Sequence, residues 1–183
     1  MFIQTEPTPN PATLKFLPGR AVMEQGTANF TDPASAACSP LAQRLFTVPG
    51  VTGVFLGTDF VTVSKDDGSE WFQLKPAVLG LIMEHFTAGL PVLLDSAAAT
   101  DEPADEDEDE VVSQIKELLD TRVRPAVAQD GGDIIFHAYE DGVVYLHMQG
   151  SCSGCPSSTA TLKAGIENML RHYVPEVQEV RAV

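Results

Sequence analysis

The sequence has few cysteines, few basic residues and no long apolar run, and each shortage argues against a class of protein. Three cysteines in 183 residues, an odd count, argue against a framework of disulfide bonds. Only 11 Lys and Arg stand against 26 Asp and Glu, and the net charge of -15 disfavours nucleic acid and anionic membranes as partners. No stretch approaches the roughly 18–20 apolar residues that span a bilayer, so we expect no transmembrane helix.

The first residues also lack the features of a targeting segment. Residues 1–7 contain neither a basic segment nor an apolar core, so they are neither a secretory signal nor an Arg-rich transit peptide. We therefore predict a cytoplasmic protein of bacterial type, or a protein of an organelle matrix whose leader has been removed. The apolar content of 44% is sufficient for packed cores.

The distribution of charge divides the chain into three parts. Residues 95–110 contain nine acidic residues and no basic residue, and so carry -9 of the net charge of -15. Repulsion at this density keeps a chain extended and solvated, which predicts a flexible acidic linker. The linker separates an expected domain at 1–94 from another at 111–183. Because both contain strand and helix patterns, we predict an α+β protein of two small two-layer domains of α/β-sandwich type.

In the first domain, short apolar runs predict strands at 2–5, 13–17, 51–56 and 60–64, and residues 20–35 look irregular. Ser39 and Pro40 open a predicted helix as its N-cap and first residue. A second helix carries an apolar stripe at i, i+3 and i+4. We expect Pro76 near its start, and the alternative is a helix that begins at Ser69 and is kinked at Pro76. The apolar stripe of this second helix consists of Val78, Leu79, Ile82, Met83 and Phe86. Trp71 and Phe72 are predicted to fill the core.

The second domain shows the order αββαβ. An apolar stripe from Val111 to Val127 predicts a helix kinked by Pro125, and the glycines of residues 130–133 end it. A hairpin follows, then a helix starting at Pro156, then a closing strand at 177–183. A three-residue loop at 140–142 would place the apolar side chains of both hairpin strands on one face. These are Ile134, Phe136, Ala138, Val144, Leu146 and Met148, and the following helix has a stripe of Leu162, Ile166, Met169, Leu170 and Tyr173.

The main candidate site is the turn at residues 150–156, Gly-Ser-Cys-Ser-Gly-Cys-Pro, between the hairpin and that helix. Its two thiols, Cys152 and Cys155, suit iron or zinc ligation, a redox dithiol, or a structural pair, and we favour iron. Free N–H groups at a helix start favour anions and lower a thiol pKa, so we expect thiolates to form readily here.

The number of thiols predicts a second copy of the chain. A tetrahedral zinc site or a cubane iron–sulfur cluster usually needs four ligands, and this domain offers two. Cys38 lies 114 residues upstream and is predicted to be half-buried near a helix start. His137 and His147 are expected to be polar surface residues on the face opposite the core. Two protomers meeting at Cys152 and Cys155 would complete the shell, which predicts a homodimer with the site at its interface.

Several motifs together resemble the Nfu/NifU-like family of iron–sulfur scaffold and carrier proteins. The NifU-like C-terminal domain is matched by residues 130–133 (DGGD), 142–146 (GVVYL) and 150–158 (GSCSGCPSS). The family's N-terminal domain is matched by residues 5–11 (TEPTPNP) with 14–16 (LKF). The resemblance covers both domains and omits only the acidic segment.

The resemblance implies a [4Fe-4S] cluster that bridges two protomers through Cys152 and Cys155. It further implies upstream cluster-assembly partners and transfer of the cluster to apo-proteins, a binding role rather than that of an enzyme. The alternative function is a thiol–disulfide oxidoreductase, whose motif also lies at a helix start. Such motifs usually place a bulky residue between the cysteines, whereas Ser153 and Gly154 stand here.

Overall fold

The computed structural model describes residues 2–94, 109–153 and 156–183, with the backbone alone at 156–158. It divides the chain into two compact units, residues 1–100 and 101–183, and each is described by itself. Most of the acidic segment expected as a linker, residues 95–108, lies outside the described residues. Within the rest of that segment, Glu110 already belongs to a helix. No helix in the described parts of the chain is both long and apolar enough to cross a membrane.

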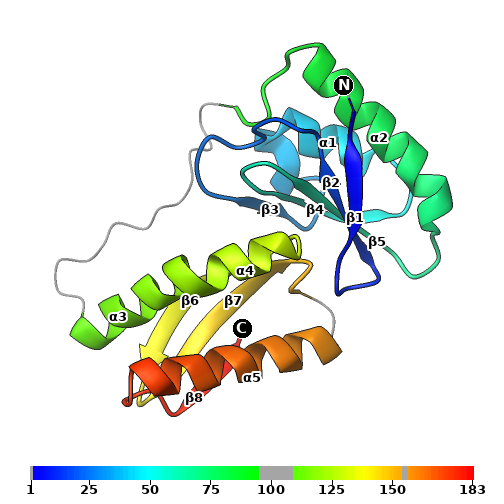
Figure 1. The fold of residues 1–183 in the computed structure, drawn as a ribbon. Coiled ribbons are helices and arrows are strands. Elements are labelled where there is room, and N and C mark those ends of the chain that lie inside the picture. The colour runs from blue at the N-terminus through cyan, green and yellow to red at the C-terminus, as the bar shows by residue number, and fades with distance from the viewer. Residues whose placement is uncertain (1, 95–108, 154–155) are drawn as a thin grey trace. The chain divides into compact units, whose positions relative to one another are not determined.

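Unit 1 is an antiparallel five-stranded sheet, in the order β1-β2-β5-β4-β3, packed against helices (Figure 1). The strands are β1 Gln4–Pro7, β2 Thr13–Leu17, β3 Ala28–Phe30, β4 Val51–Leu56 and β5 Val61–Lys65. The helices are the short 3₁₀ helix η1 Ser35–Cys38, α1 Pro40–Phe46 and α2 Trp71–Thr87. Ser39 caps α1 as expected, because its hydroxyl accepts a hydrogen bond from the Ala42 N–H at 3.1 Å.

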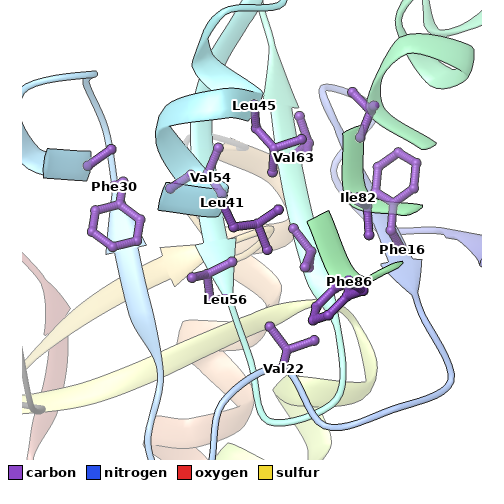
Figure 2. Packing of buried hydrophobic residues seen from close by; sticks show 14 of the residues in the cluster. Phe16, Val22, Phe30, Leu41, Leu45, Val54, Leu56, Val63, Ile82 and Phe86 are labelled. Atoms are coloured by element: carbon purple, nitrogen blue, oxygen red, sulfur yellow. The ribbon is translucent and has the colours of Figure 1, made fainter. Parts of the chain in front are cut away.

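The core of unit 1 lies between the sheet and the two longer helices. Figure 2 shows Leu41 and Leu45 of α1 beside Val54 and Val63 of the sheet, with Ile82 of α2 nearby. All five side chains are essentially inaccessible to water. Burial of this apolar surface is the main favourable term in folding this unit.

Four expectations for unit 1 were wrong in detail. The first strand begins at Gln4, because Phe2 is exposed and pairs with nothing in the sheet. A short strand, β3, lies in the stretch expected to be irregular. Helix α2 starts at Trp71 and continues through Pro76, which therefore lies inside the helix, close to the alternative of a start at Ser69. Phe72 is 73% exposed, since it lies on the face of α2 turned away from the core, whereas Trp71 packs against the core.

Unit 2 has the predicted αββαβ order. Its sheet has the order β6-β7-β8, with β6 and β7 antiparallel and β7 and β8 parallel. Along β7, buried residues alternate with more accessible ones, which means that the helices cover one face of the sheet. The elements are α3 Glu110–Leu118, η3 Leu119–Val123, α4 Arg124–Gln129, β6 Gly132–Glu140, β7 Val143–Gly150, α5 Pro156–Tyr173 and β8 Glu179–Ala182.

The helix changes its hydrogen-bonding pattern near Pro125, where the sequence predicted a kink. One turn of π-helix, η3, separates α3 from α4 and ends two residues before this proline. Proline has no N–H for the helical ladder, and π turns are a common way to absorb such a defect. The buried side chains of Ile115, Leu119, Val123 and Val127 stay on one side across the interruption, so the helical stripe still faces the core.

The hairpin loop was predicted incorrectly, although the core face was largely predicted correctly. Glu140 pairs with Val143, so the loop has two residues, Asp141 and Gly142. The register shifts instead between Phe136 and Ala138, so His137 is an extra residue in β6. This bulge turns Tyr139 toward the core in place of Ala138 and restores a common apolar face. In α5, Tyr173 is exposed, and the buried residue at the helix end is Val174.

Candidate functional site

Strand β7 and helix α5 position the predicted thiol turn. Gly150 ends β7 and Pro156 begins α5, as expected for a strand running into the turn and a helix running out of it. The structure places Cys152, the first predicted ligand. Gly154 and the second ligand, Cys155, lie outside the described residues.

Hydrogen bonds attach the start of this turn to the turn that precedes β6. The Ser151 N–H donates to the Gly131 carbonyl at 3.2 Å, and the Ser151 hydroxyl donates to the Asp130 carbonyl. The Cys152 N–H donates to the Gln149 carbonyl at 3.3 Å. Two loops separated by about twenty residues in sequence are therefore held together, and the thiol occupies a defined position.

The Cys152 side chain points into unit 2. It is 6% exposed and belongs to the same buried cluster as Ile115, Leu146 and Ile166. The Thr159 hydroxyl donates to the Cys152 carbonyl at 3.0 Å, which also holds the turn against α5. The sulfur is therefore packed as a small apolar group.

Gly132 makes room for this sulfur. A Cβ atom at position 132 would lie 2.5 Å from the Cys152 Sγ, 2.9 Å from the Gln149 oxygen and 3.0 Å from the Cys152 nitrogen. Real Cβ atoms essentially never approach heavy atoms below 3.0 Å. Only glycine fits here without displacing the thiol turn.

The expectation that Cys152 readily forms a thiolate was wrong for this buried position. Burial raises the pKa of Cys152 to about 12, because the charged form would lose its hydration. A hydrogen bond with Ser151 lowers this pKa, whereas the carboxylates of Asp130 and Asp133 raise it further. In this position the group is a neutral thiol at neutral pH.

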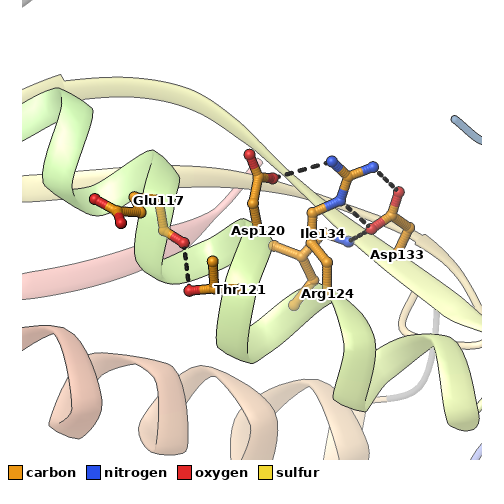
Figure 3. A network of polar contacts seen from close by, with 6 residues as sticks. All are labelled: Glu117, Asp120, Thr121, Arg124, Asp133 and Ile134. Carbon is orange, nitrogen blue, oxygen red and sulfur yellow. Dashed lines mark hydrogen bonds and ion pairs between the residues drawn. The ribbon is translucent and has the colours of Figure 1, made fainter.

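A bidentate ion pair supports the first residues of β6. The guanidinium of Arg124 in α4 donates to both carboxylate oxygens of Asp133, each at 2.9 Å, and to Asp120 at 3.0 Å (Figure 3). The Ile134 N–H donates to the same Asp133 carboxylate at 2.8 Å. The Asp133 side chain is 4% exposed, and its hydrogen bonds raise the pKa of Arg124 above its usual value. The pair fixes Asp133, and with it the adjacent Gly132 beside the thiol.

Other candidate residues lie elsewhere. Cys38 belongs to unit 1, where it is half-buried at the end of η1, as predicted. His137 and His147 are exposed, as predicted, and His147 Nδ1 lies 3.1 Å from the Val183 carbonyl oxygen. Within the described part of the chain, no three His, Cys, Asp or Glu side chains lie close enough together to hold a metal ion.

The described part of the thiol turn contains one thiol, and the described residues around it form no complete metal centre. Cys152 supplies one soft sulfur ligand of the kind that iron–sulfur clusters use, and the sequence supplies another three residues later. To reach a metal, the Cys152 sulfur must leave its buried position, since a thiolate–metal bond of about 2.3 Å needs space on its outer side.

Sequence reasoning missed Gly132 and Arg124 as residues that position the thiol. The pattern at 130–133 predicts a helix end and gives no indication of a contact with the thiol. The second glycine of that pattern was the available signal, because only the first, Gly131, has the positive φ used in the turn after α4. No local pattern connects Arg124 with Asp133, because the pair forms between a helix and a strand.

Two protein-family models match the chain. Residues 3–89 match the scaffold protein Nfu/NifU N-terminal model, and residues 115–181 match the NifU-like domain model. Together the two models match most of the chain, and each falls within one of the two units.

Curated relatives match over the whole length of this chain. An NFU1 iron–sulfur cluster scaffold homolog from Drosophila erecta, named as mitochondrial, is 58% identical over 184 residues and covers 100% of this chain. The corresponding protein of Drosophila willistoni is 55% identical over 184 residues. The chain spans 65% and 64% of the lengths of these two relatives.

A solved structure is also similar to part of the chain. The solution structure of a NifU-like protein from Saccharomyces cerevisiae is 30% identical to it, with a TM-score of 0.47. The matched region covers 52% of this chain and 86% of the yeast chain. On the two matched domains and the whole-length similarity, the chain belongs to the Nfu/NifU family of iron–sulfur cluster scaffold proteins.

Proposed function

We propose that this protein is an iron–sulfur cluster scaffold or carrier that holds a labile [4Fe-4S] cluster between two copies of the chain. Cys152 and Cys155 of each copy supply the four thiolates. The cluster is cargo: thiolates of an apo-protein replace Cys152 and Cys155 one after another, and the cluster moves to the acceptor without substrate turnover. Proteins that assemble clusters are the donors.

The observation that carries this proposal is the incomplete ligand set. Family membership points to an iron–sulfur cluster, and a cubane cluster usually needs four thiolates. Unit 2 contains only two cysteines, and its described residues contain no cluster of metal-ligating side chains. A second copy is the simplest source of the missing ligands, and a site at an interface is open to an acceptor.

The rival function is a thiol–disulfide oxidoreductase. Such enzymes need a partly exposed thiol whose pKa is lowered, because the thiolate is the attacking group. Cys152 is buried with a raised pKa, so either function requires the thiol to leave its buried position. The family of scaffold proteins to which the chain belongs favours binding over catalysis.

We propose a domain organisation and a location on similar grounds. Residues 1–94 form the Nfu-type domain and 95–109 a solvated acidic tether that allows the domains to move independently. The cluster-binding domain then begins at Glu110, one residue earlier than predicted, because Glu110 is the first residue of α3. The curated relatives are named as mitochondrial, so we extend an organelle-matrix location to this chain. That is one of the two locations predicted from the sequence.

Anaerobic reconstitution with iron and sulfide tests the function. We expect a brown protein whose mass is that of a dimer, with about four irons and four sulfides per dimer. Cys152→Ala and Cys155→Ala should each abolish the colour, and Cys38→Ala should not. A loaded species with the mass of a single chain would refute the shared site. A colourless protein that reduces disulfides catalytically would support the rival.

A further inference from the structure

The Cys152 sulfur occupies a closely fitted space beside Gly132, and cluster ligation alone does not require such a space. A cluster ligand needs an accessible sulfur, yet the Cys152 Sγ is packed inside unit 2 against the one residue type that leaves space for it. Both loops are hydrogen-bonded to each other, and the Arg124–Asp133 pair holds the strand that carries the glycine. The buried position of the thiol is therefore built by several independent contacts.

We propose that Gly132 forms a storage slot for the Cys152 thiol, and that Cys152 alternates between this buried slot and an outward position in which it binds the cluster. The inference rests on the proposed function. In the slot, the sulfur is shielded from oxidants and from stray metal ions. To bind the cluster, the residue must leave the slot, so cluster release is accompanied by a return of the thiol to the interior.

Backbone geometry makes position 132 suitable for a direct test. The φ of Gly132 lies outside the left-handed region, so an alanine there is not strained by its own backbone. A methyl group at position 132 would meet the Cys152 sulfur first, at 2.5 Å, and then the Gln149 carbonyl oxygen of β7 at 2.9 Å and the Cys152 nitrogen at 3.0 Å. Gly132→Ala should therefore drive Cys152 out of the slot. A matched control is Gly165→Ala in α5, where a new Cβ meets no atom within 4 Å.

The experiment measures alkylation of each cysteine by iodoacetamide in the full-length, metal-free chain, with site-resolved mass spectrometry. In the native wild-type chain, we expect Cys152 to react at least about tenfold more slowly than in urea. Gly132→Ala should accelerate its alkylation by about tenfold, which corresponds to about 1.4 kcal/mol of lost protection. Gly165→Ala should not accelerate alkylation of Cys152, and the half-buried Cys38 should react at the same rate in all variants.

Two outcomes would overturn the slot. In the first, native wild-type Cys152 reacts as fast as in urea, a result that needs no variant to fold. In the second, Gly132→Ala keeps its circular dichroism and its wild-type alkylation rate.

A double variant tests the contact between the two residues. Removal of the sulfur by Cys152→Ala should restore part of the thermal midpoint that Gly132→Ala loses, because Sγ is the nearest atom to the new methyl group. Absence of any recovery would refute the contact. Protection without cluster binding would refute only the proposed function, and cluster binding without protection would refute only the slot.

Discussion

At the scale of single residues, the buried polar groups of unit 2 help to hold the thiol turn in place. Asp133 is the clearest case, because a nearly inaccessible carboxylate is neutralised by a guanidinium that still reaches solvent. A buried charge is costly when unpaired, so removing one partner has a larger effect than the pair contributes by itself. Unit 1 contains a different buried polar group, His85, which is inaccessible to water.

The Arg124–Asp133 pair gives the first prediction. Arg124→Ala should destabilise unit 2 by about 2 kcal/mol, less than for a fully buried pair because the Arg124 side chain is 36% exposed. The measurement is urea unfolding followed by far-ultraviolet circular dichroism. Arg171→Ala is the control: this exposed residue lies 3.9 Å from Glu167 in α5, and its loss should have little effect. Equal effects of the two substitutions would contradict the assigned role of Arg124.

His85 gives a prediction for pH. Burial lowers the pKa of His85 from its usual 6.5, the hydrogen bond with the Pro91 carbonyl opposes this shift, and the positive charge of Arg44 adds to it. The unfolded chain therefore binds the proton more tightly than the folded one. The contribution of His85 to the stability of unit 1 should be fully present above pH 6.5 and decrease as the pH falls below that value.

Fluorescence of Trp71 can follow this loss, because Trp71 is the only tryptophan and lies in unit 1. Urea unfolding at pH values from about 8 to about 5 should show a falling midpoint in wild type. His85 is also the only histidine of unit 1, so His85→Gln should flatten the curve in this range. A slope that persists in His85→Gln would assign it to other groups.

At the scale of elements, the β6–β7 hairpin decides which side chains face the core. Its two-residue loop has positive φ at both positions, 49° at Asp141 and 81° at Gly142, the geometry that matches the twist of paired strands. A two-residue loop alone would place the apolar side chains of the two strands on opposite faces. The bulge at His137, away from the loop, shifts the register so that they share one face. The loop is also packed, since a Cβ at Gly142 would lie 3.0 Å from Gln178.

Substitution of two glycines should have opposite effects on unit 2. Gly142→Ala should destabilise it by about 1–2 kcal/mol, because alanine disfavours the left-handed conformation. Gly165→Ala should stabilise it by about 0.5–1 kcal/mol, because Gly165 lies inside α5 with open space around it. Thermal unfolding followed by circular dichroism measures both. Destabilisation by Gly165→Ala would indicate a contact that the fold does not show.

Periodicity predicted the elements of this fold well and their contacts less well. The stripe from Ile115 to Val127 and the αββαβ order follow from repeating apolar positions, which are local properties. The bulge at His137 could not be predicted, because a longer loop satisfies the same apolar pattern. The thiol turn was located by its glycines and proline, but the burial of Cys152 depends on Gly132, which is distant in sequence.

At the scale of the whole chain, each unit has its own core. The buried cluster of unit 1 runs from Ile3 to Phe86, and that of unit 2 from Ile115 to Val180. No residue belongs to both clusters within the described ranges. Separate cores are the property that lets domains fold as independent units.

Cleavage between the units tests that independence. A protease site introduced within residues 95–108, followed by cleavage, should leave the midpoint reported by Trp71 unchanged. The circular dichroism transition of unit 2 should also keep its midpoint, since few contacts are expected to cross such a boundary. A shift of either midpoint after cleavage would show that the units stabilise each other.

The place of β8 in the sheet has a consequence for newly made chains. Val180 is fully buried and pairs with Val144, so the core of unit 2 is incomplete until residues near 180 have left the ribosome. Cys152 is synthesised 28 residues earlier. At about 5–20 residues per second, the strand that completes the core is synthesised roughly one to six seconds after the thiol. Burial of Cys152 therefore belongs to the last steps in folding this unit, once β8 has paired with β7.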